Sequence, residues 1–161
     1  MREPRIIAYT PEAMTKGSMW WWILPLAPDV PERLIVGNER AFMTWFYARA
    51  ANRDAIDAET VDEYLRTFSG CEGVLGALGV YRAAFTTMAQ TAPLAAEKVK
   101  VPIVALGGEQ AQGLQIQKMV EMVAENVTGG AIPDCGHFVP EERPDELVRY
   151  VLAMIGKSGM R

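Results

Sequence analysis

The chain contains one histidine, His137, and the residues around it indicate that its side chain is presented for chemistry. It lies in the segment DCGHFVPEERP, residues 134–144, after a short apolar stretch and before an amphipathic helix that begins at a proline. We therefore expect the imidazole to lie in a loop between a strand and a helix. General bases are commonly found at such positions, because a rigid scaffold fixes the loop and the loop exposes the side chain. We interpret His137 as a candidate general base. The alternative is a surface or hydrogen-bonded structural histidine.

Other side chains near this segment give weaker signals. Residues 141–143, Glu-Glu-Arg, read as a solvated helix start whose acids complement the helix dipole. Gly107 and Gly108 are not followed by a lysine at the spacing of a phosphate-binding loop. Cys71 and Cys135 form no C-x-x-C pair, so they permit a disulfide without requiring one. The sequence predicts no metal and no cofactor.

Two halves of different character must position these residues. Residues 14–94 have a helical pattern rich in aromatic side chains. We predict a helix over 31–46 and a second that begins at the capping residue Asp57. A glycine-rich break over 70–79 precedes a third helix, which carries Tyr81.

From residue 99 the pattern alternates between strand and helix. An apolar run over 101–108 ends in two glycines and predicts a buried parallel strand. A helix over 116–127, a strand over 130–133 and a last helix over 144–156 follow. This order predicts an α/β fold. Because two parallel strands cannot form a complete doubly wound sheet, we expect an open strand edge in part of a larger design.

Composition excludes several classes of partner. The 161 residues are 50% hydrophobic and 22% charged, which predicts one globular unit. The net charge of -4 and the lack of a Lys/Arg cluster argue against nucleic acid or an anionic membrane as partner. No apolar run reaches the ~18 residues of a membrane span, and the run over 19–24 does not resemble a signal peptide. We therefore expect a soluble cytoplasmic protein.

These motifs together resemble a known family. The final third, a Val-Pro strand, a Gly-Gly turn, a helix, a strand and then Cys-Gly-His-Phe, looks like the end of an α/β-hydrolase. The segments 20–24 and 28–35, and Tyr81 with the arginine after it, are similar to the helical cap of the epoxide hydrolase and fluoroacetate dehalogenase branch. The resemblance implies a partial α/β-hydrolase fold, with a cap over 1–98 and the last two parallel strands and their helices over 99–161.

The family resemblance also implies a mechanism. In that family an aspartate attacks the substrate and forms an ester, and a histidine oriented by an acid then activates water. His137 would be the water-activating base and Tyr81 a hydrogen-bond donor from the cap. Trp20 and Trp21 would bind substrate, as a pocket wall or as donors to a halide or oxyanion. The implied substrate is a small apolar molecule such as an epoxide, with a haloacid as the alternative.

The chain departs from the family pattern at three places. The nucleophile turn has one formal match, at Cys71, but that match follows a predicted helix instead of a strand. The usual acid position holds Ala111, so Glu3 or Glu109 would have to orient the histidine. Trp20 stands where the dehalogenases carry a histidine, and an indole cannot take up a proton.

We therefore predict that the chain alone does not carry out this chemistry, since its nucleophile is not recognisable. Three interpretations remain open at this stage. The chain is a truncated hydrolase, or one half of a split enzyme that is completed by a partner pairing with the open strand over 101–107. Otherwise it is a non-catalytic module that binds a small molecule or self-associates.

Overall fold

The computed structural model describes residues 20–158. The elements follow in the order α2 (Trp20–Ile23), η1 (Leu24–Leu26), α3 (Val30–Ile35), α4 (Glu39–Tyr47), η2 (Arg53–Ala55), α5 (Ala58–Phe68), α6 (Gly70–Arg82), α7 (Ala84–Thr91), η3 (Ala92–Ala96), β1 (Ile103–Gly108), α8 (Leu114–Glu121), β2 (Val127–Ile132), α9 (Val139–Glu142) and α10 (Pro144–Ser158). We refer to residues 20–96 as the helical region and to residues 103–158 as the strand region.

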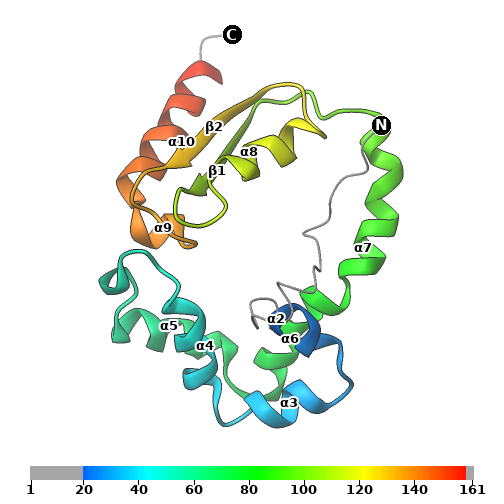
Figure 1. Cartoon of the computed structure of the whole chain (residues 1–161), viewed down its shortest axis with the longest axis vertical. Helices are drawn as coiled ribbons and strands as arrows, with labels where there is room; N and C mark the ends of the chain where they lie inside the picture. Colours follow the sequence, from blue (N-terminus) through cyan, green and yellow to red (C-terminus); the bar gives the residue numbers. More distant parts are fainter. Residues whose placement is uncertain (1–19, 159–161) are drawn as a thin grey trace.

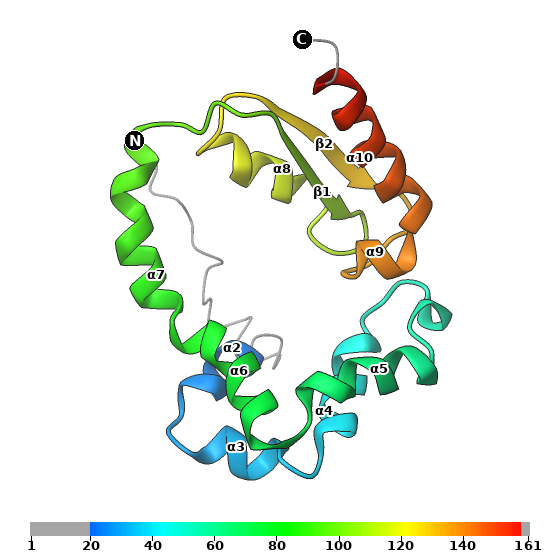
Figure 2. The same ribbon diagram turned by 180° about the vertical axis from the view of Figure 1, so that it is seen from behind.

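The two regions lie at opposite ends of the molecule and meet at two places. Figure 1 shows α2 to α6 gathered at one end and the strands with α8 and α10 at the other. Helix α7 runs along one side and joins them through η3. On the other side the loop between α4 and α5 approaches α9, as the view from behind also shows (Figure 2). The chain therefore forms a ring that is covalent on one side and closed by contacts on the other.

The helical region has its own apolar core. Its buried members are Ile35, Phe68, Val74 and Leu78, with Phe42, Met43 and Leu65 packed against them. The predicted cap of α5 is confirmed, since an Asp57 carboxylate oxygen accepts from the backbone N–H of Thr60 at 2.8 Å. This cap and the apolar stripe of α5 explain why the helix starts and which face it buries.

Two predictions for the helical region were wrong. The helix expected over 31–46 is divided into α3 and α4, because Gly37 between them adopts a left-handed φ of 87°. The break expected over 70–79 does not occur, and these residues form most of α6. Glycine lowers helix propensity by ~1 kcal/mol per residue, and the packing of α6 through Val74 and Leu78 overrides that cost.

The strand region contains a two-stranded parallel sheet, as predicted. β1 pairs with β2 from Ile103 opposite Val127 to Gly108 opposite Ile132. Helix α8 packs on both strands, and α10 lies on the other side of the sheet (Figures 1 and 2). The helix predicted to reach residue 127 ends at Glu121, because Val127 is the first residue of β2.

Helix α10 begins at Pro144, as predicted, but continues past Gly156 to Ser158. Proline is favoured at the first turn because the helix does not need its missing N–H there. Within residues 20–158, no helix combines the length and apolar character that crossing a bilayer requires.

Candidate active site

His137 lies in the loop between β2 and α9, where the sequence predicted it. Its side chain is exposed, and its ring meets that of Phe138 edge-on with centroids 5.1 Å apart. Within the part of the chain that the structure describes, the imidazole makes no hydrogen bond or ion pair. Among the described residues, no structural partner therefore fixes the ring.

A cavity of about 510 Å³ lies where the helical region faces the His137 loop. It is lined by Trp21, Trp22, Phe46, Arg49, Tyr81, Gln110, Ala111, Gln112, His137 and Phe138. A second hollow of about 450 Å³ adjoins it and again includes His137 and Tyr81. The two candidate catalytic residues, which are far apart in the sequence, thus share one largely aromatic cavity.

Tyr81 enters this cavity from the C-terminal end of α6. Its ring meets Trp22 edge-on at 5.5 Å. The next residue, Arg82, donates from Nε to the carbonyl oxygen of Pro25 at 2.7 Å and pairs with Glu32 at 2.6 Å. The hydrogen bond to Arg82 lowers the pKa of Glu32, and the same bond raises the pKa of Arg82. These contacts fix the end of α6 and so the direction in which Tyr81 points.

The two tryptophans singled out by the sequence have different surroundings. Trp21 lines the cavity, beneath the guanidinium of Arg49. Trp20 packs in an aromatic cluster instead, with ring centroids 4.8 Å from Trp45 and 6.1 Å from Phe46. This geometry suits Trp21 as a pocket wall and Trp20 as the packing that supports it.

Arg49 is a candidate site residue that the sequence did not reveal. Its guanidinium carbon lies 4.3 Å from the centre of the Trp21 ring. It has no ion pair with any described residue, and none of the described residues that line the cavity is a carboxylate. A guanidinium held against an aromatic face can bind an anionic group of a ligand. No local motif marks Arg49, because its role arises only when the loop after α4 meets Trp21.

No acidic side chain among residues 20–158 makes a hydrogen bond or ion pair with His137. Glu109 is exposed, and its carboxylate makes no hydrogen bond with the imidazole. Its backbone N–H donates to the carbonyl oxygen of Ile132 at 2.9 Å. Glu3 lies outside the described residues. Ala111, at the usual acid position, lines the cavity. Cys71 is exposed at the start of α6 and is not among the residues that line the cavity.

Glu142 contradicts the prediction of a solvated helix start. The residue is 4% exposed, and its carboxylate accepts hydrogen bonds from four backbone N–H groups. The donors are Ala51 at 2.7 Å, Asn52 at 3.2 Å, Gly136 at 2.9 Å and Phe138 at 2.9 Å. We call these four hydrogen bonds the Glu142 clasp. The sequence lacks the Ser or Thr N-cap of a capping box, since Phe138 precedes α9 and Glu142 is its last residue, so no local pattern marked these hydrogen bonds.

The charge of Glu142 is stabilised by these donors. Burial by itself raises the pKa of the carboxyl group, but the four backbone N–H groups outweigh it and hold the pKa below its usual value. The carboxylate is therefore ionised at neutral pH although it is buried.

Two glycines allow the His137 loop to lie close to its neighbours. A Cβ at Gly108, the end of β1, would overlap the carbonyl oxygen of Gly136. A Cβ at Gly136 would lie 2.6 Å from the backbone nitrogen of Ala51. Gln110 completes the contact by donating its N–H to the carbonyl of Cys135 at 2.9 Å. The Gly-Gly and Cys-Gly-His motifs therefore serve close backbone packing around the histidine.

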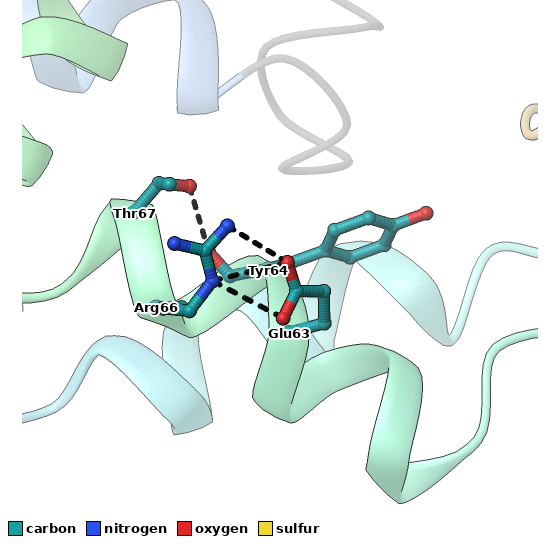
Figure 3. Close-up of polar contacts among 4 residues, drawn as sticks. All are labelled: Glu63, Tyr64, Arg66 and Thr67. Atoms are coloured by element: carbon teal, nitrogen blue, oxygen red, sulfur yellow. Dashed lines mark hydrogen bonds and ion pairs between the residues drawn. The ribbon is translucent and has the colours of Figure 1, made fainter.

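Helix α5 supports the same junction. Tyr64 donates its hydroxyl hydrogen to Glu141 at 2.7 Å, and this bond raises the pKa of Tyr64 to about 12. Figure 3 shows that the Tyr64 ring points away from the exposed ion pair of Glu63 and Arg66 on the same helix. Glu141 and Glu142 thus bind different parts of the helical region.

The described residues contain no group of three or more side chains suited to hold a metal ion. The arrangement consists of an exposed imidazole, a tyrosine, a guanidinium and aromatic walls. Such a set can exchange protons with a bound molecule and orient it.

Known proteins that are similar to this chain include epoxide hydrolases. No family model matches the sequence. A soluble epoxide hydrolase of Corynebacterium sp. (strain C12) is 34% identical over 94 residues, which are 58% of this chain and 32% of that protein. The crystal structure of Cfl2 from Burkholderia cenocepacia superposes with a TM-score of 0.81 at 34% identity, over 93% of this chain and 51% of that one. The chain has a partial α/β-hydrolase fold and resembles the epoxide hydrolases.

A further solved structure agrees with this assignment. The epoxide hydrolase CorEH superposes with a TM-score of 0.81 at 25% identity, over 93% of this chain and 53% of that one. The chain thus spans about half the length of these structures and about a third of the curated relatives it matches.

Proposed function

We propose that the chain forms the histidine- and tyrosine-bearing part of a cytoplasmic hydrolase that cleaves small apolar substrates, above all epoxides, through a covalent ester. One observation carries the proposal. His137 from the strand region and Tyr81 from the helical region line the same cavity of about 510 Å³, which has aromatic and polar walls. Similarity to epoxide hydrolases supports the choice of reaction. In this proposal residues 1–98 form the cap and residues 99–161 the core.

His137 and Tyr81 take complementary roles in the proposed reaction. A neutral imidazole accepts the proton of the water that hydrolyses the ester, and the exposure of His137 leaves room for that water. The Tyr81 hydroxyl is a neutral donor that can stabilise the alkoxide formed when an epoxide ring opens. The aromatic walls, Trp21 and Trp22 among them, bind the apolar part of the substrate.

The reaction also needs a nucleophile and an acid that orients His137. No carboxylate or thiol lines the cavity in the described part of the chain. We place both groups in the region that the matched hydrolases possess and this chain does not span. We therefore expect the 161-residue chain to bind substrate without turning it over.

A binding experiment tests this function. Aryl and alkyl epoxides and their diols are titrated into the purified chain while the imidazole signal of His137, the only histidine, is followed by NMR. We expect epoxides to shift this signal, and Tyr81→Phe to weaken binding about tenfold, the loss of one good hydrogen bond. If no epoxide shifts it, the cavity is not the substrate site. Hydrolysis abolished by His137→Ala would instead show that a nucleophile lies within the chain.

A haloacid is the second candidate substrate, and Arg49 is the observation that favours it. The guanidinium lies on Trp21 at the cavity that holds His137, without an anionic partner among the described residues. An arginine pairs well with a carboxylate through two parallel hydrogen bonds. Fluoroacetate would then bind with its carboxylate on Arg49.

A matched pair of variants tests the haloacid. Arg49→Gln removes the cation at the cavity, whereas Arg53→Gln removes an exposed arginine that does not line it. We expect fluoroacetate to shift the His137 signal in the wild type and in Arg53→Gln but not in Arg49→Gln. Equal shifts in both variants would exclude Arg49 as the carboxylate site.

A further inference from the structure

We propose that Glu142 is a positioning residue for His137. Its carboxylate fixes the loop that carries the histidine against the loop that carries Arg49, and so sets the distance between opposite walls of the cavity. The inference rests on the proposed function, because it concerns the same cavity.

The donors of the Glu142 clasp come in two pairs. Gly136 and Phe138 are the residues immediately before and after His137, and both donate to the Glu142 carboxylate at 2.9 Å. Ala51 and Asn52 follow Arg49 closely and donate at 2.7 and 3.2 Å. One carboxylate therefore holds the backbone on both sides of the histidine and the backbone just after the arginine.

The chemistry of the clasp requires a charged acceptor. A carboxylate offers about four lone-pair sites and no donor, and here four N–H groups converge on it. The residue is 4% exposed, so water cannot replace a lost acceptor. A glutamine would place an NH₂ group against at least one of these N–H groups. The isosteric amide is therefore not a conservative replacement for Glu142.

The neighbouring Glu141 provides a matched control. It is also partly buried, but its carboxylate accepts from the Tyr64 hydroxyl and not from the His137 loop. If burial of any carboxylate in α9 merely stabilised the fold, Glu141→Gln and Glu142→Gln would have similar effects on the histidine. If Glu142 positions the loop, only the second variant changes it.

The test compares Glu142→Gln and Glu141→Gln in the full chain by NMR. In Glu142→Gln we expect amide exchange at residues 51, 52, 136 and 138 to accelerate by about tenfold or more, the effect of losing a charge-assisted hydrogen bond. We also expect the His137 imidazole signal to shift or broaden. In Glu141→Gln the four amides and the imidazole should behave as in the wild type. A folded Glu142→Gln protein with unchanged exchange and an unchanged His137 signal would overturn the proposal.

A measurement on the wild-type chain covers the case in which Glu142→Gln does not fold. If one carboxylate holds both loops, its release frees all four amides together, so their exchange should rise in parallel as urea is added. Independent exchange of the two pairs would overturn the proposal. Neither experiment contains a substrate. A negative result here would therefore leave the proposed hydrolase function untouched, and a failure of the chain to bind epoxides would not change the result obtained for Glu142.

Discussion

His137 and Glu142 lie five positions apart and have opposite surroundings. The imidazole is exposed and makes no hydrogen bond with any described residue, whereas the carboxylate is buried and accepts four. The proposed chemistry and the stability of the loop therefore rest on different side chains of one short segment. Substitution of each should show this separation.

We expect His137→Ala to leave the fold nearly intact. The ring is exposed and meets the Phe138 ring edge-on, so the free energy of unfolding should change by less than about 0.5 kcal/mol, as for most surface substitutions. Urea unfolding of both proteins provides the measurement. A loss of several kcal/mol would make His137 a structural histidine.

The lowered pKa of Glu142 predicts how stability depends on pH. The unfolded chain protonates this carboxyl near the ordinary glutamate pKa of 4.5, and the folded chain does so only at lower pH. The contribution of Glu142 is therefore present above about pH 4.5 and is lost as pH falls through the folded pKa. We expect urea unfolding between about pH 3 and 6 to show this decline in the wild type and a smaller one in Glu142→Gln. Parallel pH profiles would contradict the assignment.

The residues of the site differ in how far the sequence could predict them. His137 and Tyr81 lie in local motifs, and a local motif can be recognised in the sequence without knowledge of the fold. The position of Arg49 at the cavity and the burial of Glu142 could not be predicted in this way, because each depends on contact between segments far apart in the chain. The burial of Glu142 is set by Ala51, which is 91 residues away.

Among the elements, the close approach of β1 to the His137 loop determines the shape of the site. The strand order, its parallel pairing and the start of α10 followed from apolar runs and prolines. The continuous α6 did not, because tertiary packing outweighs the low helix propensity of its glycines. Glycine therefore plays a different part at Gly76 of α6, where a Cβ would meet nothing within 4 Å, and at Gly108, where a Cβ would overlap the backbone of the His137 loop.

We expect Gly108→Ala to displace the His137 loop. The new Cβ would overlap the carbonyl oxygen of Gly136, so backbone must move, at a cost of about 1–3 kcal/mol. The matched control is Gly156→Ala in α10, whose Cβ would meet nothing within 4 Å and which should be neutral or slightly stabilising. Urea unfolding and the His137 NMR signal distinguish the two. An unshifted signal in Gly108→Ala would show that the contact does not position the loop.

For the whole molecule, the main feature is the apolar surface of the strand region. Helix α10 exposes Val148, Val151, Leu152 and Ile155, with exposed fractions of 44% to 62%. Among the described residues β1 pairs only with β2, and no other described strand lies on its second edge. Exposed apolar helices beside an open strand edge favour association.

We expect the isolated chain to self-associate at micromolar concentration. Light scattering coupled to size-exclusion chromatography measures the mass. Leu152→Glu should reduce the association, because it places a charge in the apolar face of α10, whereas Glu59→Gln on the exposed surface of α5 should not. A wild-type chain that elutes as a clean monomer would contradict this expectation.

The ring-shaped path of the chain has a consequence for the order of folding. Closing the clasp joins residues 91 positions apart, and the chain entropy lost in closing a loop of that length is about 4 kcal/mol. Contacts between the neighbouring helices α5 and α6 close much shorter loops, as does the pairing of β1 with β2, which α8 connects. These contacts can therefore form earlier. The two regions should thus acquire their own structure before they meet, and the cavity should be the last part of the molecule to form.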